Sequence, residues 1–124
     1  MIYVDKGREQ EQFISFVEHA LSILAEENYT SFLMLFDSSR LAEQDLILAL
    51  KYLDDSRSTV GVDNPAQIKR DNQRVDIYTY NDGSGYGMDY DLTTDGELND
   101  LTIQIDFLKQ KEGYFVVLDD LHTL

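Results

Sequence analysis

The chain contains no cysteine and no tryptophan, has a single proline, and shows no long apolar run. Without cysteine, neither a disulfide framework nor a thiolate metal site can form, and a cytoplasmic location is the default expectation. No segment approaches the ~18 consecutive apolar residues that would span a bilayer, and the first residues lack the apolar stretch of an export signal. We therefore expect a soluble, cytoplasmic protein without a membrane anchor.

Positive charge is also scarce. Ten Lys and Arg residues stand against 24 Asp and Glu, so the formal net charge is −14 over 124 residues. Such a field repels phosphates and argues against nucleic-acid binding, which depends mainly on Lys and Arg. It favours a basic protein as partner, although solubility alone also explains an acidic surface. The length and the 43% hydrophobic content predict one domain, residues 1–124, with its own core.

The first half, about residues 9–53, has helical periodicity. Between residues 9 and 26, apolar residues recur at steps of three and four, which places them on one stripe of an amphipathic helix. Asn28 is a suitable N-cap for a second helix that continues to about residue 36. After a break at residues 37–39, a third helix is predicted over about residues 41–53.

The second half, about residues 60–124, alternates between apolar and polar residues instead. A connection containing Pro65 holds a possible short strand near residues 60–62. Strands are then predicted around residues 75–80, 86–92, 101–107 and 114–124, separated by turns rich in Gly, Asn and Asp. This order predicts an α+β fold in which three N-terminal helices pack on a curved, four- to five-stranded antiparallel sheet.

The side chains that alternate with the expected core residues form a distinctive polar set. They are Asp76, Tyr78, Tyr80, Asp89, Asp91, Gln104 and Asp106. Like charges on neighbouring strands destabilise a sheet, so such a face calls for a compensating cation or partner. Tyrosine is enriched at interface centres, and carboxylates attract Lys and Arg. We predict that this face binds a basic protein, with Asp82, Asp95 and Glu97 as rim charges; an ordinary solvated face is the competing interpretation.

Two resemblances add to this pattern. The order of elements resembles the NTF2-like, cystatin-like cone, in which a long first helix lies against a curved sheet. The segment "DLTTDGELNDLTIQIDF…GYFVVLDDLHTL" is similar to the C-terminal signature of small uncharacterised bacterial proteins. The matching positions are Asp91, Leu92, Gly96, Asn99, Asp100, Leu101, Thr102, Gly113, Asp119, Asp120, Leu121, His122 and Leu124. Asn99 and Thr123 stand where serine and valine are usual.

Small acidic proteins of this kind are often immunity partners of secreted toxins. The resemblance and the charge together predict an acidic protein-binding module, most concretely a bacterial immunity protein. It would neutralise a basic, nuclease-type toxin by covering the toxin's active site, with no catalytic residue, no cofactor and no metal. We expect a monomer or a weak dimer, because two acidic sheet faces would repel each other.

An enzyme or a small-molecule site is the main alternative. Some NTF2-like cones bind a ligand or move a proton in the space between the first helix and the sheet. The residues that would line it here are His19, Tyr29 and Tyr90, and the candidate acids and bases are His19, His122, Asp76, Asp89, Asp91 and Asp106. A structural role is the expectation for both histidines.

Two further motifs are weak. In "DYDLTTDGEL", Asp95 stands where an EF-hand loop counted from Asp89 would need its glycine, and "GSGYG" lacks the lysine of a phosphate-binding loop. Both are expected to be ordinary polar turns.

Overall fold

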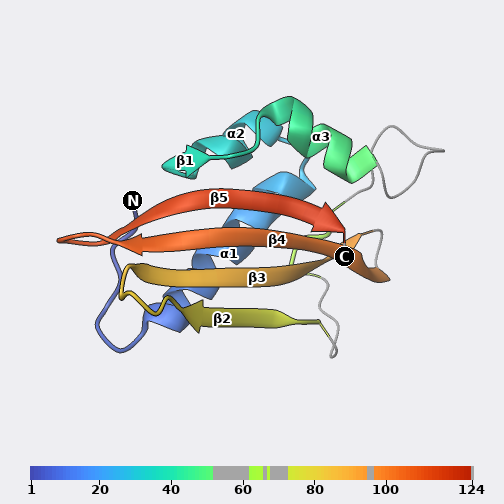
Figure 1. Cartoon of the computed structure of the whole chain (residues 1–124). Helices are drawn as coiled ribbons and strands as arrows, with labels where there is room; N and C mark the ends of the chain where they lie inside the picture. Colours follow the sequence, from blue (N-terminus) through green and yellow to red (C-terminus); the bar gives the residue numbers. More distant parts are fainter. Residues whose placement is uncertain (52–61, 66, 68–72, 95–96, 124) are drawn as a thin grey trace.

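The computed structural model describes residues 1–51, 62–65, 67, 73–94 and 97–123. Within these residues, three helices come first, with a two-residue strand between the second and the third, and four longer strands follow (Figure 1). The described part is therefore a mixed α+β structure with one five-stranded sheet.

Helix α1 (Glu9–Ala25) provides the helical side of the core. Its buried residues are Phe13, Val17, Ala20, Leu21 and Leu24, which is the stripe that the sequence predicts. Glu9 and Glu11 lie in the first turn, where negative charge favours the positive end of the helix dipole. The Phe13 ring stacks on Phe107 of the sheet, with 4.1 Å between the ring centroids. This contact fixes the helix against the strands.

Helices α2 (Tyr29–Met34) and α3 (Glu43–Lys51) are shorter. The Asn28 side chain caps α2 by accepting a hydrogen bond from the Ser31 N–H at 3.3 Å, so the predicted cap is confirmed. The Asp45 carboxylate accepts from the Ala42 N–H at 2.9 Å at the start of α3. The last two residues expected in this helix, 52 and 53, lie outside the described residues.

The sheet has the order β1-β5-β4-β3-β2. Strands β2 (Val75–Thr79), β3 (Gly85–Thr94), β4 (Glu97–Lys109) and β5 (Tyr114–Thr123) form the predicted antiparallel meander. The fully antiparallel sheet that we expected is wrong, because β1 (Ser38–Ser39) pairs with β5 in parallel and makes the sheet mixed. Asp37 holds β1 there: its carboxylate accepts from the Val116 N–H at 2.8 Å, and its own N–H donates to the Val116 carbonyl. A two-residue strand is too short to show alternation in the sequence.

Strand β5 contains a bulge that the sequence shows only indirectly. Ile105 pairs with Leu118 and Gln104 pairs with Asp120, so Asp119 is the extra residue. An extra residue shifts the alternation by one position, which allows both Leu118 and Leu121 to be buried in the core. Of the strand expected near residues 60–62, Val62 forms a β-bridge with Thr94, and residues 60 and 61 lie outside the described part.

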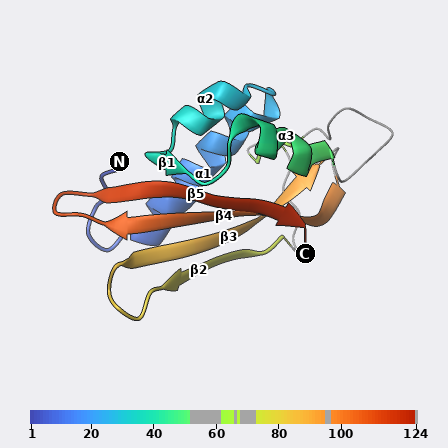
Figure 2. The same ribbon diagram turned by 45° about the horizontal axis from the view of Figure 1, so that its top comes forward.

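The helices leave one side of the sheet uncovered. In Figure 1, α1 crosses behind the strands, and in the rotated view of Figure 2 all three helices lie on the same side of the sheet. The core between helices and sheet is one cluster of buried side chains, contributed by α1, α2, α3 and every long strand except the edge strand β2. No described helix covers the side that faces the viewer in Figure 1.

Candidate functional site: an acidic sheet face

The side of the sheet that no described helix covers carries mainly polar and aromatic side chains over β2, β3 and β4, and we call it the open face. On β3, Met88, Tyr90 and Leu92 are buried in the core, so Gly87, Asp89 and Asp91 point to the other side. Strand pairing then aligns the rest in rows across the sheet. One row is Tyr78, Gly87, Asp106 and the apolar Val117, the next is Asp76, Asp89, Gln104 and Asp120, and the third pairs Asp91 with Thr102. The structure thus brings the predicted residues of β2, β3 and β4 together.

Two of the aspartates oppose each other directly. Asp76 and Asp89 are paired across β2 and β3, an arrangement that repels. Arg74 compensates for it: its NH1 group lies 3.0 Å from Asp76 Oδ2 and 3.7 Å from Asp89 Oδ2, and its NH2 group lies 3.3 Å from Asp91 Oδ1. The hydrogen bond with Asp91 is the largest cause of a raised pKa of Arg74, which keeps the guanidinium charged. Sequence reasoning missed Arg74, although it immediately precedes the first predicted strand.

The two central carboxylates are largely covered by their neighbours. The side chains of Asp89 and Asp91 are 17% and 16% exposed. Asp89 Oδ1 accepts from Gln104 Nε2 at 3.1 Å, and Asp91 Oδ1 accepts from Thr102 Oγ1 at 2.8 Å. These two carboxylates hold neighbouring side chains of the open face in place by hydrogen bonds, whereas the Asp76 side chain is 54% exposed to solvent.

The two tyrosines form the aromatic part of the open face. The Tyr78 ring lies across Gly87, where a Cβ atom on residue 87 would come within 2.3 Å of the Tyr78 Cε2 atom, so glycine is required for this close approach. Tyr78 packs edge-on against Tyr80, with centroids 5.9 Å apart. The Tyr78 hydroxyl donates to Asp89 at 3.4 Å, and the Tyr80 hydroxyl donates to Asp106.

The electrostatic state of these tyrosines reflects the surrounding carboxylates. Burial is the largest cause of the raised pKa of both phenols, followed by the charge and hydrogen bond of Asp89 for Tyr78 and of Asp106 for Tyr80. Asp119 adds to the pKa increase of both rings. Negative potential therefore surrounds the aromatic pair, and both phenols stay neutral donors at physiological pH.

The predicted rim is only partly described. Asp82 is exposed in the β2–β3 turn, where its carboxylate accepts from the Ser84 N–H at 2.9 Å. Asp95 lies outside the described residues, as does the side chain of Glu97. At the β5 side, Arg40 Nε lies 3.0 Å from Asp119 Oδ1. Asp119 and Asp120 were missing from the predicted face because the bulge interrupts the alternation of β5, from which the side of the sheet that each side chain faces would be predicted.

Of the residues expected to line a small-molecule pocket, two lie in different surroundings. Tyr90 is buried and its hydroxyl donates to Glu18 at 3.0 Å, whereas His19 is exposed on α1. Buried residues of α1 and β4, with Phe13 stacked on Phe107, occupy the region between helix and sheet. His122 has no described side chain. Within the described ranges, no group of three or more His, Asp or Glu residues is arranged to hold a metal ion.

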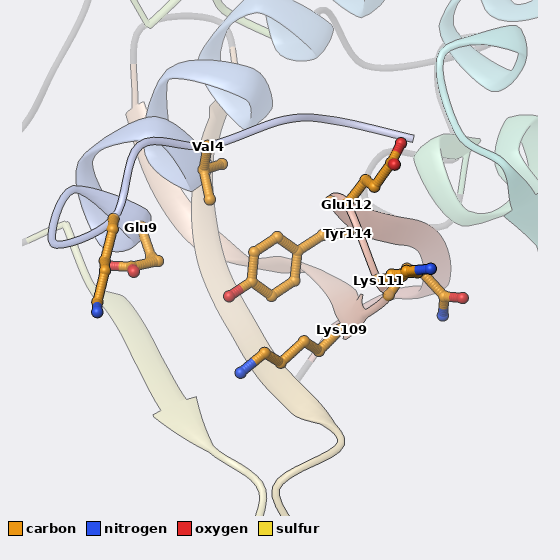
Figure 3. A pocket seen from close by; sticks show the side chains of 9 residues that line it. Val4, Glu9, Lys109, Lys111, Glu112 and Tyr114 are labelled. Carbon is orange, nitrogen blue, oxygen red and sulfur yellow. The ribbon is translucent and has the colours of Figure 1, made fainter.

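A surface depression of about 310 Å³ lies between the N-terminal segment and the β4–β5 hairpin (Figure 3). Figure 3 shows the Tyr114 ring at its centre, between Val4 and Lys109. Lys6, Lys109 and Lys111 contribute positive charge, but Glu9 and Glu112 line the same depression. This mixed lining makes it a weaker candidate than the open face.

Comparison with known protein families gives a match to one family model. A family model described as a domain of unknown function, DUF7668, matches residues 21–124. The chain belongs to the DUF7668 family. The DUF7668 match includes the whole sheet and therefore every residue of the open face, while most of α1 precedes it. No curated protein and no solved structure matches the chain. None of the described helices in this DUF7668 chain is long and apolar enough to cross a membrane.

Proposed function

We propose that this protein is an acidic protein-binding module, most concretely a bacterial immunity protein that neutralises a basic, nuclease-type toxin by covering its active site. The observation that carries the proposal is the open face: aspartates from three neighbouring strands surround two tyrosines on the side of the sheet that no described helix covers. Because Arg74 already compensates for the opposed Asp76 and Asp89, the support for a partner is the exposed surface of Tyr78 and Asp76 together with the acidic net charge.

Different residues have different roles in this proposal. Tyr78, 42% exposed, and Asp76 would contact the partner, because both present accessible surface beside one another. Asp106 would act with Tyr80, to which it is already hydrogen-bonded. Asp89, Asp91 and Gln104 would support these groups from beneath, since their own polar atoms are engaged within the face. The rim charges Asp82, Asp95 and Glu97 would mainly raise the association rate.

The chemistry of the partner follows from the charge. A nuclease active site is cationic because its substrate is a polyanion, so an acidic surface of matching extent competes with that substrate. The net charge of −14 adds long-range attraction to such a target and repels nucleic acid itself. A cytoplasmic location, which this role requires, is part of the proposal.

The proposed fold relationship is an NTF2-like, cystatin-like cone. Its support is the long helix α1, which lies against one side of a four-stranded antiparallel meander, and the C-terminal position of that meander. The relationship concerns architecture only, and the direct packing of Phe13 on Phe107 among the described residues gives no support to a ligand pocket at that place.

The experiment first identifies the partner through the open face. A photo-crosslinking amino acid replaces Tyr78, and a matched variant carries it at Met34, which is 78% exposed on α2. Both variants are expressed in the source organism, and proteins joined only at position 78 are identified by mass spectrometry. A toxin domain identified in this way is then purified and tested directly for binding and for inhibition of its nuclease activity.

Charge reversal tests the mechanism with the purified pair. We expect Asp76→Lys to weaken binding by at least about tenfold, whereas the matched reversal Glu26→Lys, exposed at the end of α1, has little effect. Binding should also weaken as ionic strength rises, because exposed charges are screened. Equal affinities for both variants, or a complex indifferent to salt, would refute the proposed role of the open face.

A further inference from the structure

Strand β2 forms one edge of the sheet, and the backbone N–H and C=O groups on its outer side have no hydrogen-bond partner among the described residues. The Tyr80 N–H donates to the Gly85 carbonyl at 3.0 Å, and the Asp91 N–H donates to the Arg74 carbonyl at 2.9 Å. In an antiparallel ladder, hydrogen-bonded pairs alternate with pairs whose backbone groups point outward. The even-numbered residues of β2 therefore bond to β3, and the N–H and C=O groups of Val75, Ile77 and Thr79 face outward. Among the described residues, none hydrogen-bonds to these outward groups.

The opposite edge of the sheet is covered along residues 114–118 of β5. Strand β1 pairs with Val117 and Leu118 of β5, and Ile2 exchanges two backbone hydrogen bonds with Tyr114. Among the described residues, the edge strand Val75–Thr79 contains no proline, no lysine and no bulge. Its one charged side chain, Asp76, is paired with Arg74.

We propose that β2 is a self-association strand that pairs antiparallel with β2 of a second copy about a two-fold axis at Ile77. This register sets Ile77 opposite its own counterpart and Val75 opposite Thr79 of the other copy, so that all outward backbone groups find partners. Asp76 lies opposite Tyr78 of the other copy rather than opposite another aspartate. The sequence of the strand is thus compatible with its own reversed copy.

Pairing along the β2 edges also avoids the repulsion that is expected when two acidic sheet faces pack against each other. Edge pairing places the two open faces side by side on one continuous surface, whereas face-to-face packing would press them together. Five residues from each strand bury less than the ~1,200 Å² of a stable interface, so we expect a weak dimer that dissociates in roughly the micromolar to millimolar range. Salt should strengthen this dimer by screening the two negative copies, the opposite of its effect on a basic partner.

The absence of native cysteine allows a register-specific test. In the proposed pairing, the Cα atoms of position 77 in the two copies are about 5.5 Å apart, within the range for a disulfide. Those of position 79 are offset by four residues along the strands, about 14 Å, which is too far. Under mild oxidation, Ile77→Cys should form covalent dimers at least about fivefold faster than Thr79→Cys.

The comparison is stringent because Thr79 is exposed and Ile77 is half-buried, so random collisions would favour position 79. Equal rates, or faster dimerisation at position 79, would overturn the proposal. Sedimentation of the unmodified chain provides a second measurement. Thr79→Pro removes an outward N–H without breaking the ladder to β3, and should lower the dimer fraction, whereas Thr79→Val should not. A chain that stays monomeric at about 1 mM and high salt would also overturn it.

Discussion

The contact between Tyr78 and Gly87 gives the most direct test of the open face. Replacing Gly87 by alanine would put a methyl group 2.3 Å from Tyr78 Cε2 and 2.5 Å from Cζ, so the ring has to leave its position. The ring would lose its contact with Tyr80 and its hydrogen bond to Asp89. An aromatic pair of this kind contributes about 1 kcal/mol to stability.

The same substitution also has a favourable effect. Gly87 lies within β3 and has no positive φ, so alanine fits the backbone there and stabilises the strand by about 0.5–1 kcal/mol. In the native background, the gain and the loss nearly cancel. In a Tyr78→Ala background only the gain remains, so Gly87→Ala should raise the free energy of unfolding. The two substitutions should therefore show a coupling of about 1 kcal/mol.

The assay is a double-mutant cycle measured by urea unfolding and followed by far-ultraviolet circular dichroism. A parallel cycle of Gly87→Ala with Met34→Ala, on the helical side, is the control and should be additive. A coupling between positions 78 and 87 below about 0.5 kcal/mol would mean that the ring does not lie across the glycine. The pair of Tyr78 and Tyr80 would then not lie over Gly87 on the open face.

Three further outcomes follow from the structure. Phe13→Ala should lower the free energy of unfolding by about 3–5 kcal/mol because the ring is fully buried, whereas Met34→Ala should change it by less than about 0.5 kcal/mol in the same denaturation assay. Burial and the hydrogen bond to Asp106 raise the pKa of Tyr80, so the folded protein keeps this proton above the ordinary value of 10.0, and stability is full below that pH and falls as pH rises beyond it. Tyr80→Phe should flatten this alkaline loss in thermal unfolding, and an unchanged slope would exclude Tyr80 as a contributor. Arg74→Met should lower the unfolding temperature at low salt and less at high salt, because screening weakens the exposed aspartate repulsion; no salt dependence would contradict the clamp.

Much of the local structure could be predicted from residue patterns. The stripe from Phe13 to Leu24 could only be buried as a helix, and the alternation around Met88, Tyr90 and Leu92 could only be buried as a strand. The polar residues between them therefore had to point away from the core. This is why the aspartates of the candidate face could be named before their neighbours were known.

Other features depend on residues that are distant in the sequence. The parallel strand β1 exists because Asp37 bonds to Val116, a contact across 79 positions that leaves no periodic signal. The bulge at Asp119 changes the direction of the last strand's side chains through pairing with β4. Sequence reasoning consequently missed the mixed sheet and the place of Asp120 on the open face.

The sequence by itself determined which side chains avoid the core, because burial of apolar surface fixes the faces of helices and strands and charge sets the preferred partner. Only the tertiary structure decided how those side chains combine. Strand register places Asp76 against Asp89 and brings Arg74 between them, and register depends on pairing between strands rather than on the pattern within one.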